Sequence, residues 1–115
     1  MTISVRGYGI DVSPEVGELV ERRLSFALSR FGGRVRAVSI SLTDLNGPRG
    51  GIDKRCSMQA RLTPRGTVRV EDTDSELPAA VDRAATRLAR AVARALERRR
   101  DGARPIGGGK SRSKA

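Results

Sequence analysis

The spacing of apolar residues is the sequence feature that most constrains the fold. In some segments every second residue is apolar, and in others every third or fourth residue is apolar. Apolar and polar residues alternate, as in half-buried strands, in residues 2–6, 36–43 and 55–62. A shorter alternation around Val68 and Val70 follows a Pro-Arg-Gly turn and predicts a fourth strand. Each predicted strand is apolar on one side only, so the sheet that they form has one buried and one exposed face.

Two other segments have the three-to-four spacing of amphipathic helices. The first begins at Pro14, after the potential cap Ser13, and we expect it to extend to about residue 31. The second begins within residues 73–75 and extends to about residue 100, with Pro78 tolerated because it lies in the first turn. The order β-α-β-β-β-α predicts an α+β two-layer sandwich, in which two amphipathic helices cover one face of a four-stranded sheet.

The length of 115 residues is enough for one hydrophobic core but not for two. We therefore expect residues 1–102 to form a single domain. Residues 103–115 are rich in Gly, Ser, Lys and Arg and have almost nothing to bury, so we expect a disordered basic tail. Residues 46–51 are rich in glycine and predict a loop between the second and third strands.

Charge is distributed unevenly along the chain, whose formal net charge is +10. Residues 1–82 have 12 basic and 11 acidic side chains, whereas residues 83–115 have 11 basic and two acidic ones. A basic surface attracts polyanions such as nucleic acids. We therefore expect a polyanionic partner to meet the C-terminal part of the chain first.

Five arginines of the second predicted helix form one stripe. Their spacings of four, three, four and four, at roughly 100° per residue, place them within an arc of about 80°. These residues are Arg83, Arg87, Arg90, Arg94 and Arg98. Only Glu97 interrupts the stripe, and like charges at this spacing repel each other. The stripe is a candidate RNA-binding surface, and the alternative is a solvated helix face without a partner.

The first predicted helix supplies a weaker basic edge. Arg23 and Arg30 lie along one side of its apolar stripe, and Arg22 points outward. Glu18 and Glu21 lie along the other side of the stripe. If the basic edge faces the second helix, the two helices form one positive cleft. Ordinary surface charge is the alternative.

Aromatic residues are few, which bears on how RNA would be recognised. Domains that read single strands stack bases on exposed rings, but the rings here are Tyr8, Phe26 and Phe31, and Phe31 lies on a buried face. Recognition of the phosphates and shape of folded RNA is therefore favoured. Residues 47–50, Gly-Pro-Arg-Gly, match the GxxG loop of KH domains, but that loop joins two helices, so a plain hairpin loop is favoured here.

The residue types argue against an enzyme. The chain has no histidine, which excludes a Ser-His-Asp arrangement. Its one cysteine, Cys56, lies on the apolar side of a strand and is expected in the core, while Asp72, Asp74 and Glu76 resemble helix-start acids rather than metal ligands. We expect no catalytic residues, no metal, no cofactor and no small-molecule substrate. No apolar run has membrane-spanning length, so we expect a cytoplasmic protein without a membrane partner.

Several short motifs occur in the order found in a known family. They are Ile3-Ser4-Val5-Arg6-Gly7, Val12-Ser13-Pro14, Val20-Glu21-Arg22-Arg23-Leu24, Glu71-Asp72, Ala79-Ala80-Val81-Asp82 and Leu88. Over about residues 2–100 the chain resembles the ribosome hibernation promoting factors, also called ribosome-associated inhibitors or ribosomal subunit interface proteins.

The resemblance implies a stress or stationary-phase factor that binds the small ribosomal subunit in the channel for messenger and transfer RNA and so blocks translation. In that family a basic surface on both helices meets ribosomal RNA. The matching residues here are Arg22, Arg23, Arg83, Arg87, Arg90 and Arg94.

The chain departs from the family pattern at Pro78, in the longer loop at 46–51 and in ending without the dimerisation domain of the long forms. The first two departures leave room for a divergent paralogue with another RNA target. We expect a monomer or a weak homodimer. Two further alternatives are a general structured-RNA-binding protein with the fold of a double-stranded-RNA-binding domain, and a protein-interaction module with an acidic partner.

Overall fold

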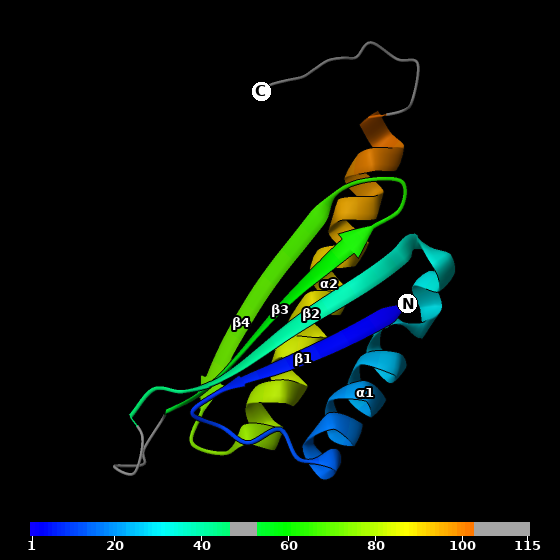
Figure 1. Ribbon diagram of the computed structural model, residues 1–115. Coiled ribbons are helices and arrows are strands. Elements are labelled where there is room, and N and C mark those ends of the chain that lie inside the picture. The colour runs from blue at the N-terminus through cyan, green and yellow to red at the C-terminus, as the bar shows by residue number, and fades with distance from the viewer. Residues whose placement is uncertain (47–52, 103–115) are drawn as a thin grey trace.

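A computed structural model describes residues 1–46 and 53–102 and confirms the predicted β-α-β-β-β-α order (Figure 1). The elements are β1 (Thr2–Tyr8), α1 (Pro14–Leu28), the short 3-10 segment η1 (Ser29–Arg34), β2 (Val35–Asp44), β3 (Lys54–Leu62), β4 (Thr67–Asp74) and α2 (Leu77–Gly102). The Gly-Pro-Arg-Gly stretch and the predicted basic tail lie outside the described residues.

The four strands form one mixed sheet in the order β1-β2-β3-β4. β1 and β2 are parallel and are joined through α1, whereas β2, β3 and β4 are successively antiparallel. The register places Ile3, Val38, Ala60 and Val68 in one row across the sheet. Figure 1 shows both helices behind the sheet, so that the opposite face is uncovered and the predicted α+β two-layer sandwich is confirmed.

The core lies between the apolar face of the sheet and the two helices. Leu24 of α1, Leu88 of α2, and Ile40 and Met58 of the sheet are almost completely buried. Burial of each such side chain stabilises the fold by about 1.5–3 kcal/mol. Cys56 is also buried, as predicted, and burial raises the pKa of its thiol to about 12, so it packs as a neutral apolar group.

Two predicted helix boundaries differ from the structure. The first α-helix ends at Leu28, and η1 carries Phe31 into the core before Gly32, with φ of 57°, turns the chain toward β2. The second helix begins at Leu77 because Thr73 and Asp74 continue β4 and pair with β3. Both residues are polar, so hydrophobic periodicity does not show that the strand includes them.

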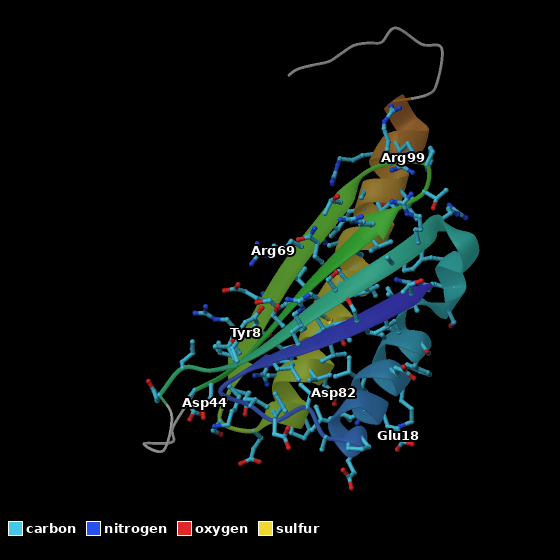
Figure 2. All side chains as sticks on the ribbon, viewed as in Figure 1. Tyr8, Glu18, Asp44, Arg69, Asp82 and Arg99 are labelled. Atoms are coloured by element: carbon cyan, nitrogen blue, oxygen red, sulfur yellow. The ribbon has the colours of Figure 1, made fainter. Side chains whose placement is uncertain are left out.

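Arg99 connects the C-terminal part of α2 to the turn between β3 and β4 (Figure 2). Its guanidinium donates hydrogen bonds to the carbonyl of Thr63, at 3.0 Å, and to the carbonyl of Arg65. Gly66, with φ of 113°, lies so close that an added Cβ would be 2.9 Å from Arg99 Nη2. This contact fixes the end of α2 against the sheet.

Candidate nucleic-acid interface

All five arginines of the predicted stripe are exposed on α2. Leu88 and Val92, which lie between them in the sequence, are completely buried against the sheet. The apolar arc of the helix thus faces the core while the arginine arc faces solvent. The predicted orientation of α2 is confirmed.

The expectation that the stripe lacks acidic partners is wrong at its N-terminal end. Arg83 pairs with two carboxylates of β4, Asp72 at 3.2 Å and Asp74 at 2.6 Å, and Arg87 Nε lies 3.0 Å from Asp72. Asp72 and Asp74 therefore belong to a strand and hold arginines of α2, rather than serving as helix-start acids. In the described part of the chain, Arg90, Arg94 and Arg98 form no ion pair, so the uncompensated charge lies toward the C-terminal end.

Asp74 is stabilised in its charged form. It accepts a hydrogen bond from the backbone N–H of Glu76 at 2.9 Å and a second from Arg83, and these bonds lower the pKa of Asp74 below its ordinary value of 3.8. The same carboxylate, followed by Asp72, raises the pKa of Arg83. Both groups are solvent-accessible, so the effect on stability is modest.

This arrangement predicts a specific acid dependence. A lowered carboxyl pKa adds stability that is fully present above the unfolded value near 3.8 and is lost as the pH falls through the folded value. Asp74→Asn should therefore have a lower Tm than the parent protein at pH 7, and the difference should shrink as the pH falls below about 4. Thermal unfolding followed by circular dichroism between pH 7 and pH 3 measures this; a difference independent of pH would contradict it.

The basic edge predicted on the first helix, which the structure divides between α1 and η1, lies toward α2, and its arginines differ in environment. Arg23 Nε lies 2.7 Å from Asp82 of α2, so this ion pair joins the helices and neutralises Arg23. Arg30 lines a hollow together with Arg90 and is not paired with a carboxylate in the described residues. Arg22 is exposed and is likewise unpaired there. Of the three residues predicted on the first helix, Arg30 is the one that lies beside the stripe without a carboxylate partner in the described residues.

Hollows lie on both sides of α2 and meet at Arg90. One, of about 530 Å³, lies against β4 and is lined by Arg69, Val70, Glu71, Arg87, Arg90 and Arg94. Another, of about 320 Å³, lies between the helices and is lined by Phe26, Ala27, Arg30, Thr86, Ala89 and Arg90. Arg69 was not among the predicted residues, because the sequence does not show that β4 is the edge strand beside α2.

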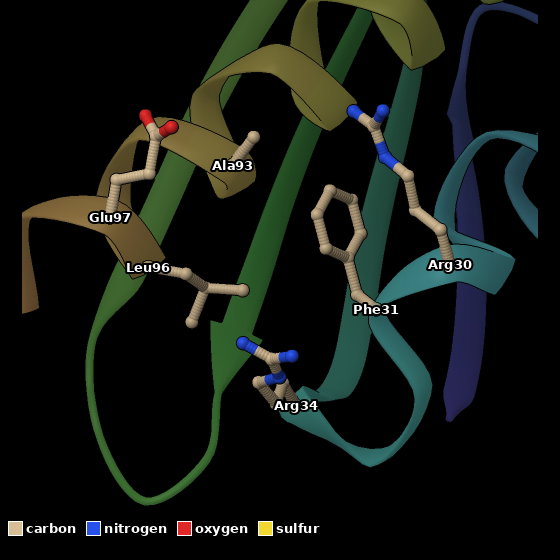
Figure 3. A pocket seen from close by; sticks show the side chains of 6 residues that line it. All are labelled: Arg30, Phe31, Arg34, Ala93, Leu96 and Glu97. Carbon is tan, nitrogen blue, oxygen red and sulfur yellow. The ribbon is translucent and has the colours of Figure 1, made fainter. Parts of the chain in front are cut away.

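A further pocket, of about 290 Å³, lies between η1 and α2 (Figure 3). Phe31, Ala93 and Leu96 form its apolar lining, with charged side chains of Arg30, Arg34 and Glu97 around them. The Arg30 guanidinium lies 4.7 Å from the centre of the Phe31 ring, a cation–π distance that holds the cation beside α2. Arg30 therefore borders both this pocket and the hollow between the helices.

We use the name arginine surface for Arg30, Arg69, Arg90, Arg94 and Arg98. These guanidiniums come from α2, β4 and the segment just after α1, and each offers several N–H donors in a planar fork that suits phosphate oxygens. Within residues 1–46 and 53–102, no group of three or more His, Cys, Asp or Glu side chains is placed to hold a metal. No helix in the same residues is long and apolar enough to cross a membrane.

Comparisons with known proteins agree with this architecture. Residues 3–100 match the sequence model of the family described as Sigma 54 modulation protein / S30EA ribosomal protein. The fold is similar to the N-terminal domain of Protein Y from Thermus thermophilus, with a TM-score of 0.70, 28% identity, and coverage of 82% of this chain and 98% of that one. It is also similar to a ribosomal subunit interface protein from Coxiella burnetii, with a TM-score of 0.68, 20% identity, and coverage of 84% and 99%. A search of curated proteins gave no match.

Proposed function

We propose, because this chain belongs to the Sigma 54 modulation protein / S30EA ribosomal protein family, that it is a ribosome hibernation factor that binds RNA of the small ribosomal subunit. The match covers residues 3–100, and so nearly all of the described α+β domain, and confirms the resemblance inferred from the sequence motifs. By occupying the small subunit the protein would inhibit translation in the cytoplasm. It would act by binding and not by catalysis.

One observation carries the proposal for the binding surface: five arginines without carboxylate partners in the described residues lie around one ridge, whereas other unpaired arginines, such as Arg6 and Arg61, lie on separate strands of the sheet. Arg90, Arg94 and Arg98 follow one another along α2, with Arg30 on one side and Arg69 on the other. Like charges this close repel each other, and bound phosphates would relieve that repulsion. RNA phosphates are therefore the partner that this surface suits best.

The shape of the surface supports folded RNA rather than a flat or extended partner. The hollow against β4 and the hollow between the helices place guanidiniums on both flanks of α2. A ridge with cations on both flanks matches a groove or crevice bounded by two phosphate backbones. Such recognition depends on phosphate positions and so on the shape of the RNA.

The arginines of the two helices should contribute unequally to RNA binding. Arg90, Arg94, Arg98 and Arg30 would make the main phosphate contacts, joined by Arg69. Arg83, Arg87 and Arg23 already have carboxylate partners, so RNA would have to compete for them, and their contribution should be smaller. Arg22 is exposed on α1 and remains a predicted RNA contact.

Co-sedimentation with isolated ribosomal subunits tests the proposal. At about 0.15 M salt, the physiological value, the protein should pellet with small subunits and not with an equal amount of large subunits. If an unrelated structured RNA at equal mass displaces the protein from the small subunits, the result would favour the alternative of a general RNA-binding protein. Failure to bind either subunit or the RNA would leave the alternative of an acidic protein partner and overturn the proposal.

A further inference from the structure

Phe26 of α1 is 88% exposed and lines the hollow between the two helices. Isolated apolar side chains are common on protein surfaces, but the surroundings of this ring are unusual. Arg30 and Arg90 line the same hollow, and Ala27 and Ala89 give it a small apolar lining. An exposed aromatic ring and two guanidiniums therefore share one small recess.

This combination matches the chemistry of one nucleotide. The flat face of an aromatic ring stacks on a nucleobase, and a guanidinium binds the phosphate that is attached to it. Bases within an RNA helix are stacked on their neighbours and cannot offer a face, so the base must be unpaired. The hollow, of about 320 Å³, suits a single planar group better than a helix of a partner protein, which is about 10–12 Å wide.

We infer that Phe26 is a stacking platform for one unpaired base of the RNA, and that Arg30 and Arg90 hold the phosphates on either side of that base. This inference rests on the proposed function and deepens it. The arginine surface contacts phosphates, and Phe26 adds a contact to a base. Charge favours an RNA over a protein occupant, because the described residues that line the hollow include two cations and no carboxylate.

Substitutions at Phe26 test the stacking role on isolated small subunits. Phe26→Ala should weaken binding about 10-fold to 100-fold, the usual effect of removing a stacking ring. Phe26→Leu should weaken it to a similar extent, because leucine is apolar but cannot stack, whereas Phe26→Tyr should bind as the parent does. The ring is exposed, so all three variants should unfold at the parent temperature.

Tyr8 provides the matched control. Its ring is 52% exposed on the uncovered face of the sheet, away from α2 (Figure 2). Tyr8→Ala removes an exposed ring of similar size and should leave binding unchanged. Parent-like binding by Phe26→Leu would show an apolar contact without stacking and would overturn the inference, as would parent-like binding by Phe26→Ala.

Fluorescence gives a second, direct readout, because the chain has no tryptophan. In Phe26→Trp, a hairpin RNA with one bulged nucleotide should quench the indole emission more than the fully paired hairpin does. Equal quenching by both RNAs would overturn the stacking role.

The variant Arg90→Glu distinguishes failure of the base contact from failure of the proposed function. If Arg90→Glu fails to bind small subunits while Phe26→Ala binds normally, only the base contact is wrong. If the parent protein itself does not bind, the proposed function fails as well.

Discussion

Replacement of Arg90, Arg94 and Arg98 by glutamate is expected to abolish binding to small ribosomal subunits while the protein remains folded. The three side chains are exposed and form no ion pair within the described residues, so their reversal leaves the core contacts of Leu88 and Val92 intact. Toward RNA, three attractions become three repulsions, and like charges at an interface cost several kcal/mol, or at least about 100-fold in affinity. Co-sedimentation and thermal unfolding measure the two outcomes.

A control with the same change in net charge separates position from total charge. Arg6 and Arg61 are exposed on the open side of the sheet, and Arg65 is exposed in the turn between β3 and β4. Their joint replacement by glutamate should reduce affinity much less than the α2 triple does. Equal losses in the two variants would mean that net charge alone drives association, and a larger loss in the control would place the RNA on the sheet side.

Affinity for RNA is expected to fall steeply as salt increases. Each phosphate neutralised by a cation releases counterions, and log K falls by about 0.7–0.9 per contact for each tenfold rise in salt. The arginine surface has five guanidiniums, so the slope should be about −4 and affinity should fall about 250-fold between about 50 and 200 mM salt. Filter binding to isolated small subunits over this range measures the slope.

Single substitutions show which arginines contribute to that slope. Arg94→Gln should reduce its magnitude by about one unit, whereas Arg65→Gln should leave it unchanged. Arg83→Gln should also change it little, because Asp72 and Asp74 already compensate this guanidinium. A flat salt dependence would contradict the electrostatic basis of the proposed function.

The fold could be predicted from the sequence because its elements are encoded locally. Alternation in β2 and β3 and helical spacing in α1 and α2 follow from backbone geometry alone. The boundaries of the helices and strands were harder to predict from the sequence. Thr73 and Asp74, for example, join β4 only because β3 offers them backbone partners. The start of α2 therefore depends on a tertiary contact and not on the pattern of apolar residues.

The candidate site, like the fold, could be predicted from the sequence only in part. The outward orientation of Arg90 and Arg94 follows from the angular spacing of residues on a helix, and this part of the prediction is confirmed. The pairing of Arg83 with Asp72 depends on β4 lying beside the first turns of α2, which the sequence does not show. Arg69 and Phe26 were missed as members of the surface for the same reason, since each reaches it through the packing of a neighbouring element.

The carboxylates that neutralise the first turns of α2 also influence how the protein approaches its partner. Asp72 and Asp74 compensate cations at the N-terminal end of the helix, whereas Arg94 and Arg98 stay uncompensated in the described residues near the other end. Uncompensated positive charge on the described part of α2 is thus concentrated toward its C-terminal end, and the field of a polyanion would turn the molecule during diffusion so that this end leads before any contact forms. Pre-orientation raises the fraction of collisions that are productive, so salt should act mainly on the association rate and much less on the lifetime of the bound state.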